Sequence, residues 1–209
     1  MGLATRNCRK FRNQNITMQI VNFDQGSPGW LAWRKSGLGG SDACNIVGKA
    51  PWNDPEKLRL EKLGSSRQDG PNTAMMRGIR LEPEARLLFQ GLTGLRVRPV
   101  CVIHDTIPWL KASLDGITND YKTFIEIKCP TKLQAHQAAL RGRYPDYYKP
   151  QIYHCFNVTQ ADRCIFGSYY PDADKGKQLV LIELHPEPEY QEWLFLREKE
   201  FFEDLQKNS

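Results

Sequence analysis

The chain has 209 residues and a mass of 24.1 kDa, which is enough for one sizeable domain with a buried core. Its composition is 40% hydrophobic and 25% charged, as in ordinary globular proteins, and the net charge of +5 gives slight support for a polyanionic partner. No apolar run reaches the length of a membrane span, and the first residues lack the apolar core of a signal peptide, so we expect a cytoplasmic protein without membrane contact.

The cysteines and histidines do not indicate a zinc centre. Six cysteines and four histidines are scattered along the chain without the short spacings that zinc sites use. We expect reduced, mostly buried thiols and assign no catalytic role to a histidine. The whole chain, 1–209, is interpreted as a single domain with an N-terminal extension at 1–26 and a core at about 27–206.

The first part of the chain carries the start and stop signals of helices. The run "SPGWLAWRKSG" at 27–37 has a serine cap, a proline at the first helical position and a closing glycine. A glycine turn in "GGSDACNIVG" leads to a second helix that begins near Ser41, and "DPEKLRLEKLG" at 54–64 predicts a third. A loop at 64–72 then separates these helices from a longer one at 73–92.

The 73–92 helix has apolar residues at steps of three and four, which is the period of a buried stripe. These residues are Met75, Ile79, Ala85, Phe89 and Leu92. Glu82 lies seven residues from both Met75 and Phe89, so we expect its carboxylate on the buried side, where it needs a partner such as a metal ion. Pro83 follows directly and is expected to kink the helix.

The pattern then changes to short, β-branched runs bounded by turns, which are typical of strands. The predicted strands are 95–103, 109–117, 124–129, 162–170 and 178–184. Helices are expected near 132–142 and 145–157, between the third and fourth strands, and a last helix at 187–206. This order predicts an α/β fold with a central mixed five-stranded sheet flanked by helices.

Asp115, Glu126 and Lys128 form a carboxylate–lysine pattern within "SLDGITNDYKTFIEIKCPTK" at 113–132. Side chains alternate along a strand, so Glu126 and Lys128 share one face, opposite the isoleucines beside them. If the two strands pair as a hairpin, Asp115 lies next to Glu126. Two close carboxylates repel unless a cation neutralises them, and their oxygens favour Mg²⁺ or Mn²⁺. Lys128 is then placed to orient or deprotonate an attacking water, or to stabilise developing charge.

The residues alone leave other interpretations open. A D-x(10)-E-x-K match is common, so the three charges can belong to an ordinary surface hairpin. The run "GGSDA" nearly spells the G-x-S-x-G elbow of serine hydrolases, but a helical period precedes it and no acid–histidine pair follows. A non-catalytic DNA-binding module on a decayed nuclease fold is a further alternative, and the intact acidic and lysine positions argue against it.

The run "LDG…EIKCP", preceded by "RGIRLEPEA" and "WLAWRKSGLGGSDA", resembles the phage lambda exonuclease and YqaJ-type viral recombinase family of alkaline exonucleases. This family belongs to the PD-(D/E)xK nuclease superfamily, and the resemblance covers roughly 27–205 in the same motif order. It implies a restriction-endonuclease-like core. It also implies that Asp115, Glu126, the carbonyl of Ile127 and Glu82 bind two Mg²⁺ ions per active site, for which Mn²⁺ substitutes.

The resemblance assigns the catalytic residues as well. Lys128 matches the catalytic lysine, acting with the carboxylates of Asp115 and Glu126. Gln151, in "YYKPQIYHC", matches a glutamine that sits beside the water and the lysine. Related recombination nucleases have a tyrosine four positions after this glutamine, where this chain has Cys155, so no tyrosine is assigned.

Two further groups of residues are implied by the resemblance. Arg34, Ser41 and Ser113 match a positive pocket for the 5′-terminal phosphate, and a helix that begins near Ser41 is compatible with an anion site. Met75, with Met76 beside it, matches an apolar wedge that parts the terminal base pairs. The alternative for these methionines is an ordinary place in the hydrophobic core.

The activity implied is that of a Mg²⁺-dependent 5′-to-3′ exonuclease. Such an enzyme degrades one strand of linear double-stranded DNA to mononucleotides and leaves 3′ single-stranded overhangs for phage-type recombination by strand annealing. The resemblance also implies a homotrimer ring around the DNA, a single-strand annealing protein as partner, and a phage or prophage gene expressed in the cytoplasm of a bacterial host. An endonuclease of restriction or repair type is the alternative, and the phosphate pocket favours end recognition.

Overall fold

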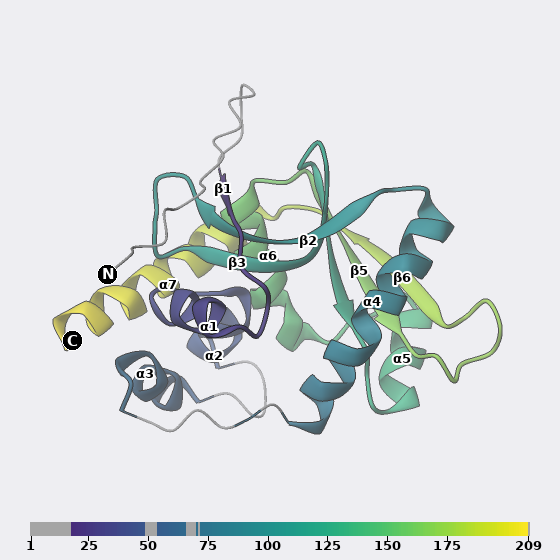
Figure 1. Ribbon diagram of the computed structural model, residues 1–209, viewed down its shortest axis with the longest axis horizontal. Coiled ribbons are helices and arrows are strands. Elements are labelled where there is room, and N and C mark those ends of the chain that lie inside the picture. The colour runs from purple at the N-terminus through teal and green to yellow at the C-terminus, as the bar shows by residue number, and fades with distance from the viewer. Residues whose placement is uncertain (1–17, 49–53, 66–69, 71, 209) are drawn as a thin grey trace, which may run out of the picture.

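A mixed sheet of six strands forms the centre of the protein (Figure 1), in a computed structural model that describes residues 18–48, 54–65, 70 and 72–208. The strands are β1 (Met18–Val21), β2 (Val97–His104), β3 (Lys111–Thr118), β4 (Thr123–Lys128), β5 (Arg163–Tyr169) and β6 (Leu179–Leu184). They lie side by side in chain order, and each neighbouring pair is antiparallel except β4 and β5. The predicted α/β fold with a mixed, helix-flanked sheet is therefore confirmed.

Helices cover both faces of this sheet. They are α1 (Pro28–Lys35), α2 (Gly40–Ile46), α3 (Pro55–Leu63), α4 (Thr73–Thr93), α5 (Leu133–Leu140), α6 (Lys149–Thr159) and α7 (Pro188–Lys207), with a short 3-10 turn at Asp146–Tyr148 before α6. Serine and aspartate caps begin α1 and α3 as the sequence predicts, because Ser27 and Asp54 accept hydrogen bonds from the first backbone N–H groups. None of the helices in the described part of the chain has the length and hydropathy of a membrane span.

The sheet has six strands rather than the predicted five. The additional strand, β1, lies within the predicted N-terminal extension and pairs antiparallel with β2, with Met18 opposite His104 and Val21 opposite Cys101. A run of four residues carries too little alternation to be recognised as a strand, and its position is determined by the edge of β2 that it covers.

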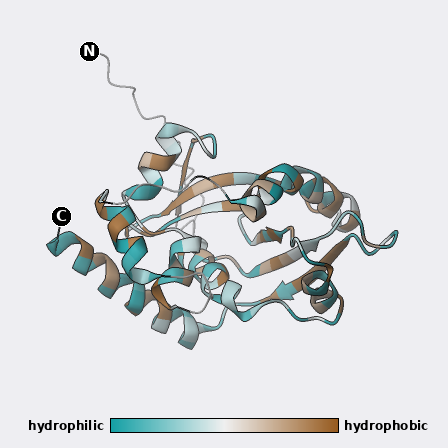
Figure 2. Ribbon diagram, turned by 90° about the horizontal axis from the view of Figure 1, so that it is seen from below, coloured by the Kyte–Doolittle hydropathy of each residue, from teal (hydrophilic) through white to brown (hydrophobic). Residues whose placement is uncertain are grey.

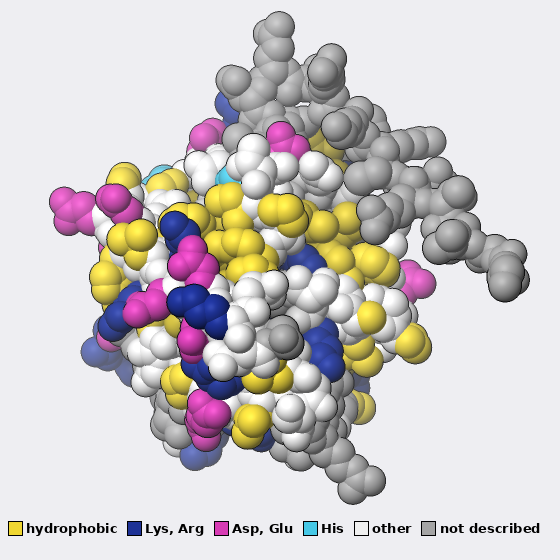
Figure 3. All heavy atoms as spheres, turned by 90° about the vertical axis from the view of Figure 1, so that its left-hand side faces the viewer, with side chains coloured by type: hydrophobic (Ala, Val, Ile, Leu, Met, Phe, Trp, Pro, Cys, Tyr) yellow, Lys and Arg dark blue, Asp and Glu magenta, His cyan; other side chains and the backbone are white. Residues whose placement is uncertain are grey.

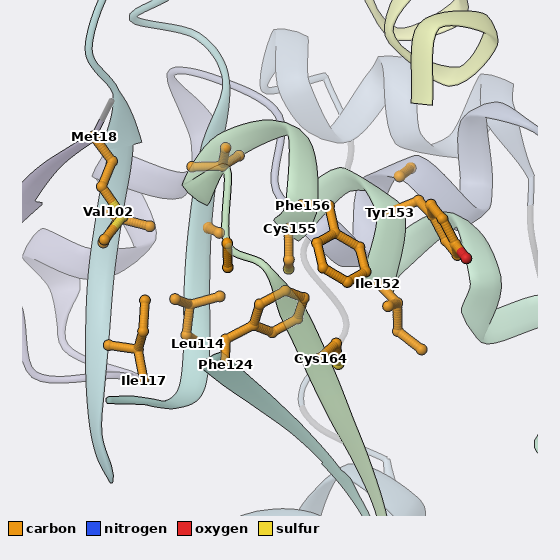
Figure 4. Packing of buried hydrophobic residues seen from close by; sticks show 14 of the residues in the cluster. Met18, Val102, Leu114, Ile117, Phe124, Ile152, Tyr153, Cys155, Phe156 and Cys164 are labelled. Carbon is orange, nitrogen blue, oxygen red and sulfur yellow. The ribbon is translucent and has the colours of Figure 1, made fainter. Parts of the chain in front are cut away.

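One face of the sheet packs against α6, which is buried along most of its length. Figure 4 shows this packing, in which Phe124 of β4 lies against Phe156 of α6 with ring centroids 4.9 Å apart. Leu114 and Cys164 are also fully buried in this cluster. In Figure 2, α7 carries alternating teal and brown segments, as expected for a helix with Leu194 on the core and its other side in solvent.

The opposite face of the sheet is covered by α4 through Leu81, Ala85 and Phe89. The predicted stripe is therefore only partly correct. Its members Met75, Ile79 and Leu92 are 55%, 63% and 62% exposed. The reason is that α4 contacts the sheet only over its central turns, and periodicity alone does not reveal how far a helix overlaps its partner. The helix continues through Pro83.

Cys101, Cys129, Cys155 and Cys164 are free thiols, and all but Cys129 are buried. Cys44 is also buried, and its Sγ donates to the backbone carbonyl of Tyr147. This agrees with the expectation from their spacing. Cys8 lies outside the described residues.

Candidate active site

The candidate site lies where β3 and β4 separate. The two strands pair only at Gly116 with Ile125 and at Ile117 with Phe124, so the ladder ends before Asp115 and Glu126 face each other. Here the Asp115 side chain replaces the missing ladder bond, because its Oδ2 accepts a hydrogen bond of 2.7 Å from the backbone N–H of Ile127. The predicted pairing thus brings Asp115 beside the strand that carries Glu126.

Glu126, Lys128 and Gln151 are connected by direct contacts. Glu126 is 2% exposed, and its Oε1 lies 2.6 Å from the Lys128 Nζ. Gln151, in the first turn of α6, donates through Nε2 to the same Oε1 at 2.6 Å and accepts from the Lys128 Nζ at 3.1 Å. The Lys128 ammonium also lies 4.6 Å from the centre of the Tyr148 ring. Gln151 therefore fixes the lysine and the carboxylate relative to each other.

Glu82 reaches the site from α4 and is half-buried there. Its Oε1 accepts a hydrogen bond of 2.9 Å from Arg86 Nη1, one helical turn further on. The same Arg86 nitrogen donates to the backbone carbonyl of Asp115, which ties α4 to β3. Sequence reasoning missed Arg86, because an acid–arginine pair at i,i+4 is normally a surface ion pair.

Burial and neighbouring charges shift the pKa values of Asp115, Glu82 and Lys128. Burial raises the pKa of Asp115 well above its ordinary value, and the nearby Glu126 and Glu82 carboxylates add to the effect. Burial likewise raises the pKa of Glu82, against the opposing influence of Arg86. Burial disfavours the Lys128 ammonium, yet Glu126 and Asp115 outweigh it and raise the pKa of Lys128 above its ordinary value. Three carboxylates thus gather around two cations, and an additional cation would relieve their repulsion.

Whether these residues fit a metal ion depends on the side chains and their present partners. Among the described residues, no three His, Cys, Asp or Glu side chains are grouped so that they hold an ion as they stand. Glu82 is turned to Arg86 and Glu126 to Lys128. The donor chemistry fits nevertheless, because carboxylate oxygens are the ligands that Mg²⁺ takes. The pKa of Asp115 is raised by burial first and then by the Glu126 and Glu82 carboxylates, which a bound cation would offset. Ile127, whose carbonyl is the fourth predicted ligand, lies beside Asp115.

The three predicted phosphate-binding residues come together around Trp30 of α1. Arg34 Nη2 donates to the Ser41 Oγ at 2.5 Å, and the Arg34 guanidinium lies 4.7 Å from the centre of the Trp30 ring. Trp30 Nε1 in turn donates to the Ser113 Oγ at 2.9 Å. Ser113 precedes Asp115 by two residues on β3, so this pocket is adjacent to the carboxylates. Trp30 was not identified from the sequence, since a tryptophan in an amphipathic helix is normally part of the core.

A close backbone approach connects α2, which begins beside Ser41, to Gln151 on α6. Gly40, at the start of α2, lies so near α6 that a Cβ there would be 3.0 Å from the Gln151 Cγ and 3.4 Å from the Cys155 Sγ. Only glycine allows this approach without displacing Gln151. The absence of a side chain in "GGSDA" therefore has a structural reason that differs from that of a nucleophile elbow.

Met75 and Met76 lie in the first turn of α4, where the Asn72 side chain accepts a hydrogen bond from the Met75 N–H. They are 55% and 53% exposed, so the alternative that they belong to the core is wrong. Exposed thioethers at a helix end are compatible with contact to a base, and their role as a wedge stays a prediction.

Comparisons with known proteins identify the family. Residues 29–162 match the model of the YqaJ-like viral recombinase domain. The chain belongs to this family. A curated relative, the uncharacterized protein YqaJ of Bacillus subtilis strain 168, is 26% identical over 88% of the chain, and the chain spans 57% of the length of that relative.

Solved structures support the same conclusion. The alkaline exonuclease LHK-Exo of Laribacter hongkongensis, also solved in complex with dAMP, is 25% identical, with a TM-score of 0.76 over 87% of this chain and 94% of the other. A phage-related exonuclease of Haemophilus somnus 129PT has the same fold, with a TM-score of 0.61 at 12% identity over 83% of this chain and 96% of the other. The resemblance found in the sequence motifs is confirmed.

Proposed function

We propose that this protein is a Mg²⁺-dependent 5′-to-3′ exonuclease that degrades one strand of linear double-stranded DNA to mononucleotides. The observation that carries the proposal is the adjacency of two sites of opposite charge on β3. Asp115 belongs to the site where β3 and β4 separate, which holds Asp115, Glu126 and Glu82 and is called the fork below. Ser113 belongs to the pocket with Arg34. An enzyme that binds the terminal phosphate beside its active site places the scissile phosphodiester at a fixed distance from the strand end, and therefore removes nucleotides from that end.

The residues of the fork have separate tasks in this proposal. Asp115, Glu126 and Glu82, with the carbonyl of Ile127, would hold two Mg²⁺ ions, and Mn²⁺ would serve in their place. When bound, the ions supply Lewis-acid activation of the phosphate and neutralise its charge. For this role Glu82 would have to give up its contact with Arg86, which would keep its hydrogen bond to the Asp115 carbonyl.

Lys128 and Gln151 act on the attacking water and on the phosphate. With its raised pKa, Lys128 is an ammonium, so an orienting and charge-stabilising role is favoured over that of a base. Gln151 keeps Lys128 in place through its Oε1. Attack of water on phosphorus breaks the bond to the 3′ oxygen of the terminal nucleotide. The remaining strand then ends in a new 5′-phosphate, which is the group that Arg34, Ser41 and Ser113 would bind in the next cycle.

The assembly and the cellular role are part of the proposal. By similarity to its family, the protein would form a homotrimer ring around the duplex and pass its 3′ overhangs to a single-strand annealing protein. A phage or prophage gene in a bacterial host is the context that fits such recombination. Figure 3 shows one side of the molecule, on which basic and acidic side chains are interspersed. A surface of mixed sign attracts a polyanion less than a basic one, so we do not assign the DNA to this side.

An endonuclease of restriction or repair type is the alternative, and digestion of two DNA forms separates them. The exonuclease degrades end-labelled linear duplex in the presence of Mg²⁺, leaves a closed circle of the same sequence intact, and is inactive in EDTA. Cutting of the closed circle would favour the endonuclease, and digestion of the linear form in EDTA would contradict the metal requirement.

A further inference from the structure

A buried lysine from α3 supports the turn between α1 and α2 that carries Arg34 and Ser41. The Lys62 Nζ donates to the backbone carbonyl of Arg34 at 3.0 Å and to that of Gly37 at 2.7 Å. Arg34 is in the last turn of α1, where backbone carbonyls run out of partners within the helix, and Gly37 follows the Ser36 cap. A cation at the C-terminal end of a helix also interacts favourably with its dipole. Lys62 therefore fixes the backbone of the arginine that reaches the phosphate pocket.

The same ammonium forms a buried ion pair with Asp42. The two groups are 2.6 Å apart, and both side chains are only 9% exposed. The Asp42 Oδ2 also accepts a hydrogen bond of 2.8 Å from the N–H of Gly39, which closes the turn before Ser41. Lys62 thus holds one end of the turn through the carbonyls of Arg34 and Gly37, and Asp42 holds the other through the N–H of Gly39.

The charge of Asp42 matters because Arg34 is close to it. Burial opposes ionisation of Asp42, but the Lys62 ammonium and then the Arg34 guanidinium outweigh this effect and hold the pKa of Asp42 below its ordinary value. Without Lys62, the Asp42 carboxylate would compete with a bound phosphate for the Arg34 guanidinium. Neutralisation by Lys62 leaves the charge of Arg34 available to an anion.

We propose that Lys62, acting through Asp42 and the Arg34 backbone, is a positioning residue that sets the preference of the enzyme for 5′-phosphorylated ends. This inference rests on the proposed function, because it concerns the same pocket. Lys62 does not contact the DNA. It supports the turn from which the Arg34 Nη2 donates to the Ser41 Oγ at 2.5 Å, and it neutralises the Asp42 carboxylate near them.

The test compares Lys62→Met with Lys35→Met on duplexes that differ only in carrying a 5′-phosphate or a 5′-hydroxyl. Lys35 is an exposed lysine in the last turn of α1, so its replacement removes one positive charge beside the pocket without touching the Asp42 pair. We expect Lys62→Met to lower the ratio of kcat/KM for 5′-phosphorylated ends to kcat/KM for 5′-hydroxyl ends about tenfold, equivalent to about 1.4 kcal/mol. The change should come mainly from a higher KM for phosphorylated ends. Lys35→Met should keep the wild-type ratio.

A double variant covers the case in which Lys62→Met leaves Asp42 as an unpaired buried charge and unfolds. Asp42→Asn/Lys62→Met removes both charges, so we expect it to fold and still to lose the preference, since the carbonyls of Arg34 and Gly37 remain untethered. A wild-type ratio in either folded variant would overturn the role of Lys62. A wild-type enzyme that does not distinguish the two ends would instead contradict the phosphate pocket of the proposed function, so the two failures are distinguishable.

Discussion

The fork between β3 and β4 and the pocket beside α1 differ in the sign of their charge surplus. In the fork, Asp115, Glu126 and Glu82 outnumber Arg86 and Lys128, and the pKa of Asp115 is raised by burial and then by its fellow carboxylates. Around the pocket, the cations outnumber a single carboxylate, which is Asp42. They are Arg34, Lys62 and Lys111, and the Lys111 Nζ donates to the backbone carbonyl of Trp33 in α1 at 2.9 Å. The difference supports the proposal that one site accepts a cation and that its neighbour accepts an anion.

The largest effect should follow from removing a carboxylate of the fork. We expect Asp115→Asn or Glu126→Gln to lower Mg²⁺-dependent digestion about a thousandfold, at the upper end of the range for a lost electrostatic contact. Metal-free Asp115→Asn should unfold at a temperature no lower than wild type, because the buried, repelled charge is gone. Digestion assays and thermal melts check both points. Asp162→Asn, on the exposed loop before β5, is the matched control and should digest normally.

Removing the cation of the fork should have the next largest effect. Lys128→Met is expected to slow digestion by about a hundredfold to a thousandfold, since it deprives the reaction of an oriented ammonium, while duplex binding is retained. Single-turnover rates and fluorescence anisotropy separate the two quantities. Lys122→Met, whose side chain is 68% exposed, controls for the loss of one lysine. Wild-type rates in Lys128→Met would remove the lysine from the mechanism.

The anion side of the comparison is tested by Arg34→Ala. A charge-assisted contact to phosphate is worth about 1.5–3 kcal/mol, so digestion of 5′-phosphorylated ends should fall about tenfold to a hundredfold, and that of 5′-hydroxyl ends less. Arg197→Ala, in an ion pair on α7, should leave both rates unchanged. If Arg34→Ala slows both ends equally, Arg34 is a general DNA contact and the two sites are not specialised as described.

The two sites also show what can be predicted from sequence. Alternation along the strand correctly placed Glu126 and Lys128 on one face, and the hairpin brought Asp115 beside them, because strand geometry is local. Arg86 was missed because its contact with the Asp115 carbonyl depends on how α4 crosses β3. Lys62 was missed for the same reason, since 20 residues separate it from Asp42.

The fold shows the same division between local and tertiary information. Helix caps, turns and the longer strands follow from residues within a few positions, so the α/β order was predicted correctly. The edge strand β1 is only four residues long and is defined by pairing with β2, 80 residues away. The exposed start of α4 at Met75 depends likewise on where the helix leaves the sheet.

A smaller effect on the digestion rate is expected from replacing Met75 or Met76, which would separate the terminal base pairs of the duplex. Opening a base-pair step costs about one to two kcal/mol, so Met75→Ala or Met76→Ala should slow digestion of blunt duplex by up to about tenfold and be largely rescued by mismatched ends. Because both side chains are more than half exposed, the melting temperature should not change. Leu87→Ala, another exposed apolar residue of α4, is the control. Equal loss on both substrates would place the strand-parting residue elsewhere.

The last prediction concerns stability rather than activity, namely its pH dependence on the pocket side. Burial, with a smaller contribution from Lys62, lowers the pKa of Lys111 to about 8 from the ordinary 10.5. Between these pH values the unfolded chain binds more protons, so the free energy of unfolding should rise with pH, by up to about 3 kcal/mol from this residue. The difference in unfolding free energy between wild type and Lys111→Met, measured by urea titration from pH 7 to 10.5, isolates this contribution. A difference that is constant over this range would mean that Lys111 keeps an ordinary pKa.

The most direct test of two cooperating sites is the order in which labels leave a linear duplex in Mg²⁺. One strand carries a label on its 5′-terminal nucleotide and a second label on its 3′-terminal nucleotide, and the 5′ end is phosphorylated. We expect the 5′ label to appear first, as a mononucleotide, while the 3′ label remains in the shortening strand. Release of the 3′ label first, or of internal fragments longer than a mononucleotide, would contradict a phosphate pocket that positions the strand end at the Asp115–Glu126 fork.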